Sequence, residues 1–549
     1  MQSESKLSIW FVMLAFTLLV GPFALDFHMH YPDEMYYTDA AVRMMQTGDI
    51  QTAYLGNGEL RFKKPILTYW FVLAGFELFG VTPFASRFFF LLAGAMTIGG
   101  VYWAAKLMFK DTRIAQLSSL IMASYPVLIM SATRSIPDVL LGMFMAMAAL
   151  GFIGFIRYGN DTPRRYSWIL FLGLALAFEV KGLPALALGG LGLIYLSVNP
   201  WQRVKVQRVF YFPAVLVGLV VASYWFVAMY WIHGADYLNS FVEDQVGVRV
   251  ASRYLLIAKN LLLAIVLMIV LFIPWFLFGM KGFQKNFKKL FYEEKAFTGF
   301  VVLWLVAILL MSAMVTKFYE RYLLPVVPLS TIWVAWLLVK NGFLEKVRAM
   351  RVVLFFFIAL NLIVLLVGVF FNAMLPTSNW IWLQILLDLA VIVYMVSQRK
   401  AISKLPALIS FSILLLFFGA SISTYQISLP DVGQLVKGYA EEQELAKGSQ
   451  IGYLGHLHAG SKIRIGLGPD FRMVGLDEVN FPERFGDFDY LILEEKYLDK
   501  LPSDKYEIQL AALNWDAKYI SEMFAALWDG NAEEVKMKYG KKFYWAKPN

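Results

Sequence analysis

The chain has 549 residues, of which 59% are hydrophobic and only 16% are charged, and its net charge is +9. Soluble domains carry about 25% charged residues, so this composition excludes an ordinary soluble protein and is typical of a polytopic membrane protein. Cytoplasmic loops of such proteins account for an excess of Lys and Arg, and no motif for RNA or DNA binding is present, so we expect no nucleic-acid partner. Because the chain has no cysteine, disulfides and thiolate metal sites are excluded.

Hydrophobic runs that are long enough to cross a bilayer recur up to about residue 424. Backbone groups find no water in hydrocarbon, so runs of this length must be helices. The N-terminal residues 1–6 are too short for a signal peptide, and we expect the first helix to be retained. We predict about thirteen spans, at residues 7–25, 86–107, 114–131, 138–156, 167–179, 183–198, 211–231, 259–279, 298–315, 322–339, 352–371, 379–396 and 405–424.

Loop charge predicts the topology of these spans. With a cytoplasmic N-terminus, about 22 Lys and Arg fall on the inner side and about four fall in the short outer loops. Segment 66–80 is apolar enough to cross, but counting it would move most basic loops outside. We therefore predict that it lies in the outer interface or is re-entrant, with Tyr69 and Trp70 as interfacial anchors. The alternative is that it crosses and that a later short segment does not.

The composition divides the chain into two predicted domains. Residues 1–429 form an all-α polytopic membrane domain with two long outer loops, 26–86 and 232–258. Residues 430–549 are polar, with short apolar runs at 451–454, 472–476 and 490–493 between Gly and Pro. This pattern predicts a small soluble α/β domain on the outer side.

Ionisable and aromatic residues gather in the predicted outer loops. Ionisable groups at membrane depth are costly and usually serve a function, although groups at the ends of spans are much cheaper. A carboxylate can orient or deprotonate an acceptor, and Lys or Arg can stabilise a leaving phosphate. Asp33, Lys64, Arg249 and Arg321 supply such a set for attack on a sugar that is carried on a lipid phosphate.

Simpler structural readings stay open for several of these residues. Glu34 can be a solvated or locally paired acid, and Asp138 can cap its helix. Lys63 and Lys64 can extend to lipid headgroups without binding substrate. A pair of histidines, His28 and His30, precedes Asp33. We expect these histidines to line the loop and not to bind a metal.

Short motifs, in their order and spacing, resemble those of a known family. They are Asp33-Glu34-Met-Tyr-Tyr37, Phe62-Lys63-Lys64-Pro65, Arg134-Ser-Ile-Pro-Asp138, Lys181-Gly182-Leu-Pro184 and Arg321-Tyr322-Leu-Leu-Pro325. Over about residues 7–340 the chain resembles the polyprenyl-phosphate-sugar glycosyltransferases of the GT-C fold. Within them it is most similar to the lipid A aminoarabinose transferase (ArnT) branch and its protein-mannosyltransferase-like relatives.

The resemblance implies an enzyme of the bacterial inner membrane whose site faces the periplasm. Its donor would be an undecaprenyl-phosphate sugar, and its acceptor lipid A, lipopolysaccharide core or a related envelope glycan. Asp33 and Asp138 would be the catalytic carboxylates. The donor phosphate would be bound by Lys64, Lys63, Arg249, Arg321 and Lys317, and the substrate pocket would include Glu34, Tyr37, Arg61, Lys181, Gln245 and Tyr322.

Two departures from the family pattern affect the metal prediction. Where the family has Phe-Glu-Lys-Pro, this chain has Lys63 in place of the acid, and where relatives often carry a histidine it has Gln245. In the aminoarabinose branch these positions are associated with a bound metal, and neither residue here is a good ligand. We therefore predict no metal and no cofactor.

The leading hypothesis is a metal-independent glycosyltransferase that works as a monomer among membrane lipids and transfers one sugar. A polytopic lipid or glycolipid transporter or flippase without covalent chemistry is the alternative. Transporters usually place functional charge near the bilayer midplane and often contain repeats, whereas here the charge gathers on one side and no repeat is evident. A third hypothesis makes the C-terminal domain a docking platform for partner proteins.

Overall fold

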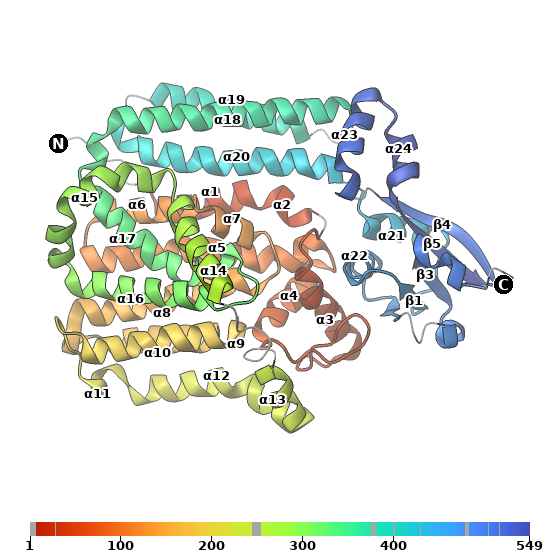
Figure 1. Ribbon diagram of the computed structural model, residues 1–549, viewed down its shortest axis with the longest axis horizontal. Coiled ribbons are helices and arrows are strands. Elements are labelled where there is room, and N and C mark those ends of the chain that lie inside the picture. Colours follow the sequence, from red (N-terminus) through yellow and green to blue (C-terminus); the bar gives the residue numbers. More distant parts are fainter. Residues whose placement is uncertain are drawn as a thin grey trace.

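The computed structural model describes residues 7–27, 29–243, 254–374, 380–398, 401–428, 430–477, 482–502, 504–514 and 517–549. Long helices lie side by side along the longest axis of the molecule, and a small mixed sheet lies beyond one end of them (Figure 1). The protein is therefore a multi-pass helical membrane protein with a C-terminal α/β unit, as the sequence predicts.

The first half of the bundle contains α1 (Ile9–Val20), α2 (Pro22–Asp26), α3 (Glu34–Thr47), α4 (Leu67–Phe79), α5 (Pro83–Phe109), α6 (Thr112–Ala123), α7 (Pro126–Ala132), α8 (Pro137–Tyr158), α9 (Arg164–Lys181), α10 (Leu183–Val198), α11 (Val206–Val209), α12 (Phe212–His233) and α13 (Ala235–Val242). The second half contains α14 (Tyr254–Val270), α15 (Trp275–Glu293), α16 (Lys295–Ala313), the 3₁₀ segment η3 (Glu320–Val326), α17 (Val327–Lys340), α18 (Val347–Met374), α19 (Trp380–Gln398) and α20 (Leu405–Ser428).

A helix occupies each of the thirteen predicted spans, but the helices differ in length. Eight helices of the described ranges are long and apolar enough to cross a membrane, or nine if α6 and α7 form one bent span. The shorter apolar helices are α1, α4, α10 and α14. The prediction is therefore correct for the positions of the helices, while full-length spans are fewer than thirteen.

Three predicted spans are each divided between two α-helices. Span 7–25 is divided at Gly21 into α1 and α2, and Pro22 begins the second helix. Segment 114–131 is split into α6 and α7, which meet at 59°, and Pro126 begins the second helix. The predicted span 259–279 is wrong as a single helix, because α14 ends at Val270 and α15 starts after Pro274. Proline has no N–H to donate and clashes with the preceding turn, so each break falls next to a proline.

The ambiguous apolar segment 66–80 forms α4. Figure 1 shows α4 with α3 at the end of the bundle that faces the sheet. Its placement in the membrane interface stays a prediction. The indole Nε1 of Trp70 donates a hydrogen bond of 2.7 Å to the carbonyl of Ile50, so α4 is held to the outer loop that precedes it. A Cβ on Gly75 would lie 2.0 Å from the carbonyl oxygen of Ala85, which shows how closely α4 approaches α5.

The C-terminal sheet has the strand order β2-β1-β3-β5-β4. Its strands are β1 (Gln450–Leu454), β2 (Arg472–Gly475), β3 (Tyr490–Glu494), β4 (Tyr506–Asn514) and β5 (Lys541–Pro548). The first three strands are parallel, with Ile451 opposite Met473 and Tyr490, and β5 runs antiparallel to both β3 and β4. These parallel strands are the three short apolar runs of the sequence, because parallel strands are buried on both faces.

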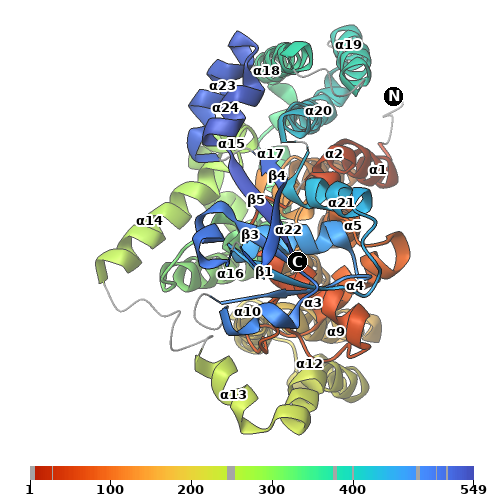
Figure 2. The same ribbon diagram turned by 90° about the vertical axis from the view of Figure 1, so that its right-hand side faces the viewer.

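Four C-terminal helices accompany this sheet (Figure 2): α21 (Val432–Glu442), α22 (Leu457–Leu467), α23 (Ile520–Asp529) and α24 (Ala532–Tyr539). Val436 of α21 and Ile463 of α22 join Ile451 and Ile492 of the sheet in one apolar core. The sheet and these two helices therefore share a core of their own.

Close packing of α8 against α9 brings two charged residues together. A Cβ on Gly151 would lie 2.7 Å from the backbone N of Leu170, and a Cβ on Gly173 would lie 2.7 Å from that of Ala148. Small residues let membrane helices approach to backbone contact. Since α8 begins at the end of the bundle where α9 finishes, Asp138 and Lys181 meet there.

Candidate active site

A charged cavity of about 240 Å³ lies at the end of the bundle that faces the sheet. Its lining comes from the ends of four helical elements, α3, α8, α9 and η3, and from the loop between α3 and α4. The lining residues are Asp33, Tyr36, Tyr37, Arg61, Lys63, Lys64, Pro137, Asp138, Lys181, Arg321 and Tyr322. Two of the larger grooves, of about 660 and 580 Å³, lie between α1, α19 and α20 and are lined almost entirely by apolar side chains. A third, of about 620 Å³, lies at the start of α18 and has one carboxylate, Glu345, in its lining, whereas the charged cavity has two. The small charged cavity is therefore the candidate for chemistry.

An ion-pair network connects the two carboxylates of the cavity. Arg321 Nη2 donates a hydrogen bond of 2.8 Å to Asp33 Oδ2, and its Nε lies 3.1 Å from Asp138 Oδ2 in an ion pair without hydrogen-bond geometry. Lys181 Nζ lies 2.5 Å from Asp138 Oδ1. Both oxygens of Asp138 are thus engaged by cations, and the cavity brings together residues of α8, α9 and η3 with Asp33.

The two carboxylates differ in exposure. The Asp138 side chain is 3% exposed, whereas that of Asp33 is 46% exposed. Partial burial raises the pKa of Asp33 above its ordinary value, and the nearby charge of Asp138 raises it further, against the opposing effects of Arg61, Lys181 and Lys64. Asp33 is consequently the more accessible of the two groups.

Aromatic rings hold the cations of the loop before α4. The Arg61 guanidinium lies 3.7 Å from the ring centre of Tyr36, and its Nε donates a hydrogen bond of 3.0 Å to the hydroxyl of Tyr69. The rings of Tyr37 and Tyr69 are 4.9 Å apart. Rings placed over a guanidinium stabilise it and fix its direction. Lys64, the next lining cation, is buried, so its ammonium is confined to the cavity region.

The charge balance of the cavity favours an anion. Five cationic side chains and two carboxylates line it. Clefts that are lined by an excess of one charge concentrate ligands of the opposite charge. The arrangement can hold a phosphate and still present one carboxylate, Asp33, to a neutral reacting group.

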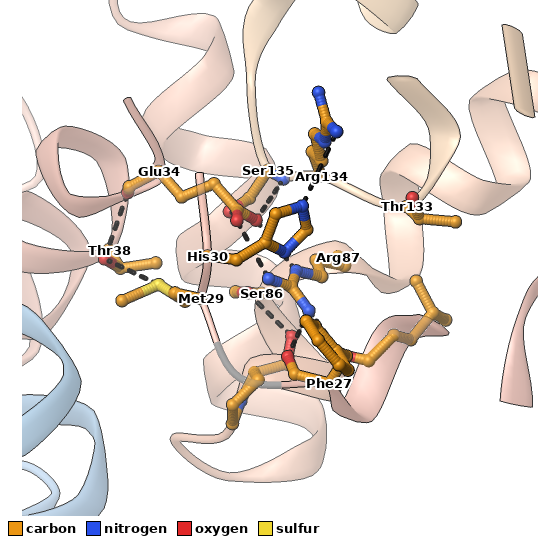
Figure 3. Close-up of polar contacts among 12 residues, drawn as sticks. Phe27, Met29, His30, Glu34, Thr38, Ser86, Arg87, Thr133, Arg134 and Ser135 are labelled. Carbon is orange, nitrogen blue, oxygen red and sulfur yellow. Dashed lines mark hydrogen bonds and ion pairs between the residues drawn. The ribbon is translucent and has the colours of Figure 1, made fainter. Parts of the chain in front are cut away.

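Glu34 is the clearest correction to the predicted site. Its side chain is fully buried and is not among the residues that line the cavity. Figure 3 shows it beside Arg87 and Ser135. Its carboxylate accepts hydrogen bonds from Arg87 at 2.7 and 2.8 Å and from the backbone N–H of Ser135 at 2.9 Å. Arg87 also donates to the carbonyls of Leu25 and Phe27. Glu34 therefore fastens α3 to α2, to α5 and to the loop before α8, and the prediction that it belongs to the substrate pocket is wrong.

The pKa of Glu34 reflects this pairing. Burial acts to raise it, but the charge and hydrogen bonds of Arg87, together with the Ser135 N–H, outweigh burial and hold the pKa below its ordinary value. The carboxylate is therefore charged at neutral pH.

Three other predicted residues lie elsewhere or outside the description. Lys317 is exposed, and the described residues that line the cavity do not include it. Gln245 and Arg249 lie outside the described residues. Sequence reasoning gave no site role to Tyr36 or Pro137, which both line the cavity. Both residues could have been identified from their positions in the sequence. Tyr36 lies about one helical turn after Asp33, and Pro137 immediately precedes Asp138.

The described residues do not bring a set of metal-ligand side chains together. Within those ranges, no group of three or more His, Cys, Asp or Glu could hold a metal ion. The absence of a metal and of a cofactor stays a prediction, because one of the two positions on which it rests, Gln245, is outside the description.

Several known sequences that are similar to this chain carry the names of sugar transferases. A family model described as dolichyl-phosphate-mannose-protein mannosyltransferase matches residues 63–227. The undecaprenyl phosphate-alpha-4-amino-4-deoxy-L-arabinose arabinosyl transferase of Serratia proteamaculans is 26% identical over 60% of this chain and 59% of its own length. The protein of the same name from Aeromonas hydrophila is 30% identical over 38% of each chain. The chain spans only part, from 34% to 59%, of the first curated relatives that it matches.

Comparison with solved structures extends over nearly the whole chain. The crystal structure of ArnT from Cupriavidus metallidurans bound to undecaprenyl phosphate superposes with a TM-score of 0.70 and 20% identity, and covers 98% of both chains. The apo crystal structure of the same protein gives a TM-score of 0.69. The chain therefore has the GT-C fold of ArnT, and the resemblance that the sequence motifs indicate is confirmed.

Proposed function

We propose that this chain, built on the ArnT fold, is an integral membrane glycosyltransferase. It moves a single sugar from an undecaprenyl-phosphate donor to a cell-envelope acceptor, which is lipid A, lipopolysaccharide core or a related glycan. The observation that carries the proposal is the shared cavity, in which the accessible carboxylate of Asp33 faces five cations. Similarity to proteins named arabinosyl transferases, and to an ArnT bound to undecaprenyl phosphate, supports the lipid-phosphate donor.

The cations of the cavity bind the donor phosphate in this proposal. Arg321 offers a planar fork of donors, and Lys64 and Lys63 add point charges. Drug-sized ligands occupy pockets of about 300–1,000 Å³, so a cavity of about 240 Å³ suits one sugar with its phosphate better than an oligosaccharide. The lipid tail then lies outside the cavity, among the apolar helices.

Asp33 orients the acceptor or takes its proton. An acceptor oxygen attacks the anomeric carbon, its proton passes to the Asp33 carboxylate, and the bond between the anomeric carbon and the phosphate oxygen breaks with inversion. The leaving group is undecaprenyl phosphate, which is a weak base and needs no proton. Its added negative charge is stabilised by Lys64 and Arg321.

Asp138 acts through other residues in this mechanism. Both of its oxygens engage cations, and it is almost fully buried. A carboxylate in this state orients Lys181 and Arg321 and is poorly placed to accept a proton from substrate. We therefore assign Asp138 a positioning role, which revises the catalytic role that the family resemblance implies.

The enzyme is proposed to lie in the bacterial inner membrane, with the cavity and residues 430–549 on the periplasmic side. The excess of Lys and Arg in the predicted inner loops supports this orientation. The helix α3, whose first turn lines the cavity, lies at the same end of the bundle as the C-terminal sheet, opposite the N-terminus, which agrees with this orientation (Figure 1). We propose a monomer that needs no metal.

Transfer by the purified protein tests the proposal. The unaltered protein is incubated with native bacterial lipid extract, and mass spectrometry follows sugar gain by lipid A or core and the appearance of undecaprenyl phosphate. We expect Asp33→Asn to lower transfer by at least about 100-fold. Undiminished transfer by both Asp33→Asn and Lys64→Ala would refute the assigned roles. Movement of an unmodified lipid across the bilayer, without transfer, would instead favour a transporter.

A further inference from the structure

The C-terminal domain is fastened to the helix that carries the proposed catalytic carboxylate. Figures 1 and 2 both show α22 of the C-terminal unit beside α3. The side chain of Arg464 on α22 forms a buried ion pair with Asp39 on α3. These two residues are 425 positions apart in the sequence, so the contact joins opposite ends of the chain.

The Arg464 guanidinium also reaches the loop that supplies the cations. Its Nη2 donates a hydrogen bond of 3.0 Å to the carbonyl of Gly56, in the loop between α3 and α4. A Cβ on Gly56 would lie 2.5 Å from Arg464 Nη1 and 2.7 Å from Asp39 Oδ2, so only glycine fits without displacing the pair. The backbone N–H of Gly475 on β2 donates to the same carbonyl at 3.1 Å. One buried guanidinium thus contacts α3 and the loop that leads to Arg61 and Lys64.

Two further contacts continue this junction along α3. The hydroxyls of Thr38 and Ser461 lie 3.2 Å apart, and both side chains are buried. The amide of Gln46 donates a hydrogen bond of 2.9 Å to the carbonyl of Phe471. Together with Asp39, these residues place the contact with the C-terminal domain on one side of α3.

The other side of the same helix lines the cavity. Asp33 immediately precedes α3, and Tyr36 and Tyr37 follow in its first turn. Since a helix moves as a rigid rod, a shift of the Asp39 side displaces Asp33 relative to Arg321, which is held by η3. A misplacement of about 1 Å can lower a rate by roughly 100-fold.

We propose that Arg464 is a positioning residue for sugar transfer, and that the C-terminal domain is part of the catalytic unit because it holds α3 in register with the cations of the cavity. This inference rests on the proposed function. It assigns the C-terminal domain a role within the enzyme itself, and binding of partner proteins to that domain is not required.

Kinetics of the full-length protein in lipid nanodiscs test the inference. We expect Arg464→Met to lower kcat by about 10- to 100-fold, while the donor KM changes less than about threefold, because Lys181 and Arg321 keep their own partners. Arg464→Lys keeps the charge and is expected to recover part of the loss. Lys462→Met is the matched control, since Lys462 lies on the same helix but pairs with Asp431 inside the C-terminal domain at 3.3 Å.

A covalent replacement of the ion pair separates positioning from a failure to fold. Because the chain has no cysteine, Thr38→Cys and Ser461→Cys introduce a single possible disulfide between α3 and α22. In the Arg464→Met background, oxidation is expected to restore kcat to within about threefold of the unaltered protein, and reduction to abolish the recovery. A cross-link that forms, as shown by mass, without any recovery of kcat would overturn the inference.

Amide hydrogen exchange tests the junction without using activity. We expect Arg464→Met to raise exchange in α3 by at least about 10-fold relative to α8, since local opening then needs less free energy. Unchanged exchange in α3 would contradict the inference. If the unaltered protein transfers no sugar, the proposed function fails and the exchange measurement still decides whether the C-terminal domain holds α3.

Discussion

Asp33 and Glu34 are neighbours in the sequence, and the structure predicts opposite consequences for their loss. Asp33→Asn removes a carboxylate that is 46% exposed in the cavity. Glu34→Gln removes a fully buried carboxylate that holds Arg87 at 2.7 and 2.8 Å. We expect the first variant to fold and to lose transfer, and the second to lose stability.

The magnitudes follow from burial. Removing one partner of a buried ion pair costs about 3–5 kcal/mol, because the remaining charge is left without its counter-charge. In this variant Arg87 keeps its carbonyl partners. It loses Glu34, which is its only carboxylate partner among the described residues. Folded domains are stable by only about 5–15 kcal/mol, so Glu34→Gln threatens the fold. Asp33 is 46% exposed, and its partner Arg321 keeps an ion pair with Asp138. Asp33→Asn should therefore cost less stability than Glu34→Gln, while it lowers transfer by about 100- to 10,000-fold.

The assay compares thermal unfolding and transfer for both variants in the same detergent. Transfer is normalised to the folded fraction, so that loss of protein is not counted as loss of chemistry. A Glu34→Gln protein that unfolds at the temperature of the unaltered protein, yet transfers no sugar, would return Glu34 to the substrate pocket and refute the reasoning.

Three further predictions concern charge and pH. Lys64→Met should raise the donor KM by about 10- to 100-fold in steady-state transfer assays, because a charged contact to the phosphate is lost. Lys317→Met should leave the donor KM unchanged. Equal effects of the two variants on KM would contradict the assignment of Lys64 to the cavity. In the pH profile of kcat/KM, the midpoint of the acidic limb should lie above the ordinary Asp pKa of 3.8. This midpoint should move to lower pH in Asp138→Asn, because a like charge beside Asp33 is removed. A midpoint that stays in place would exclude Asp33 as the titrating group. The difference in unfolding free energy between the unaltered protein and Glu34→Gln should be full above pH 4.5 and shrink at lower pH. The pKa of Glu34 is depressed in the folded state, and protonation removes the charge that the variant lacks. Denaturant unfolding at several pH values measures this difference, and a constant difference would show that charge is not the cause.

The helices and most of the site could be predicted because their signals are local. Apolar runs fixed the positions of the helices, and the polar clusters around Asp33, Lys64 and Asp138 sit at helix ends, where charge in a membrane protein is visible in the sequence. The breaks in three predicted spans could not be placed, because hydropathy counts apolar residues and does not register the lost backbone N–H at Pro22, Pro126 or Pro274.

Other errors arose from tertiary partners that no local pattern reveals. Glu34 looks like Asp33 in the sequence, and only its contact with Arg87, 53 residues away, shows that it is structural. The bond between Asp39 and Arg464 is equally invisible. Strands β4 and β5 were not anticipated individually, since β4 has largely exposed or half-buried positions and β5 begins and ends with charged or exposed residues.

The central claim is that the charged cavity binds the phosphate of a lipid-linked sugar beside Asp33. An experimental structure of the purified protein with added undecaprenyl phosphate tests it most directly. We expect the phosphate oxygens within about 3 Å of Lys64 Nζ and of the Arg321 guanidinium, with the Asp33 carboxylate open toward the acceptor side. A phosphate bound at the other end of the bundle, or held by residues that do not line this cavity, would contradict the account.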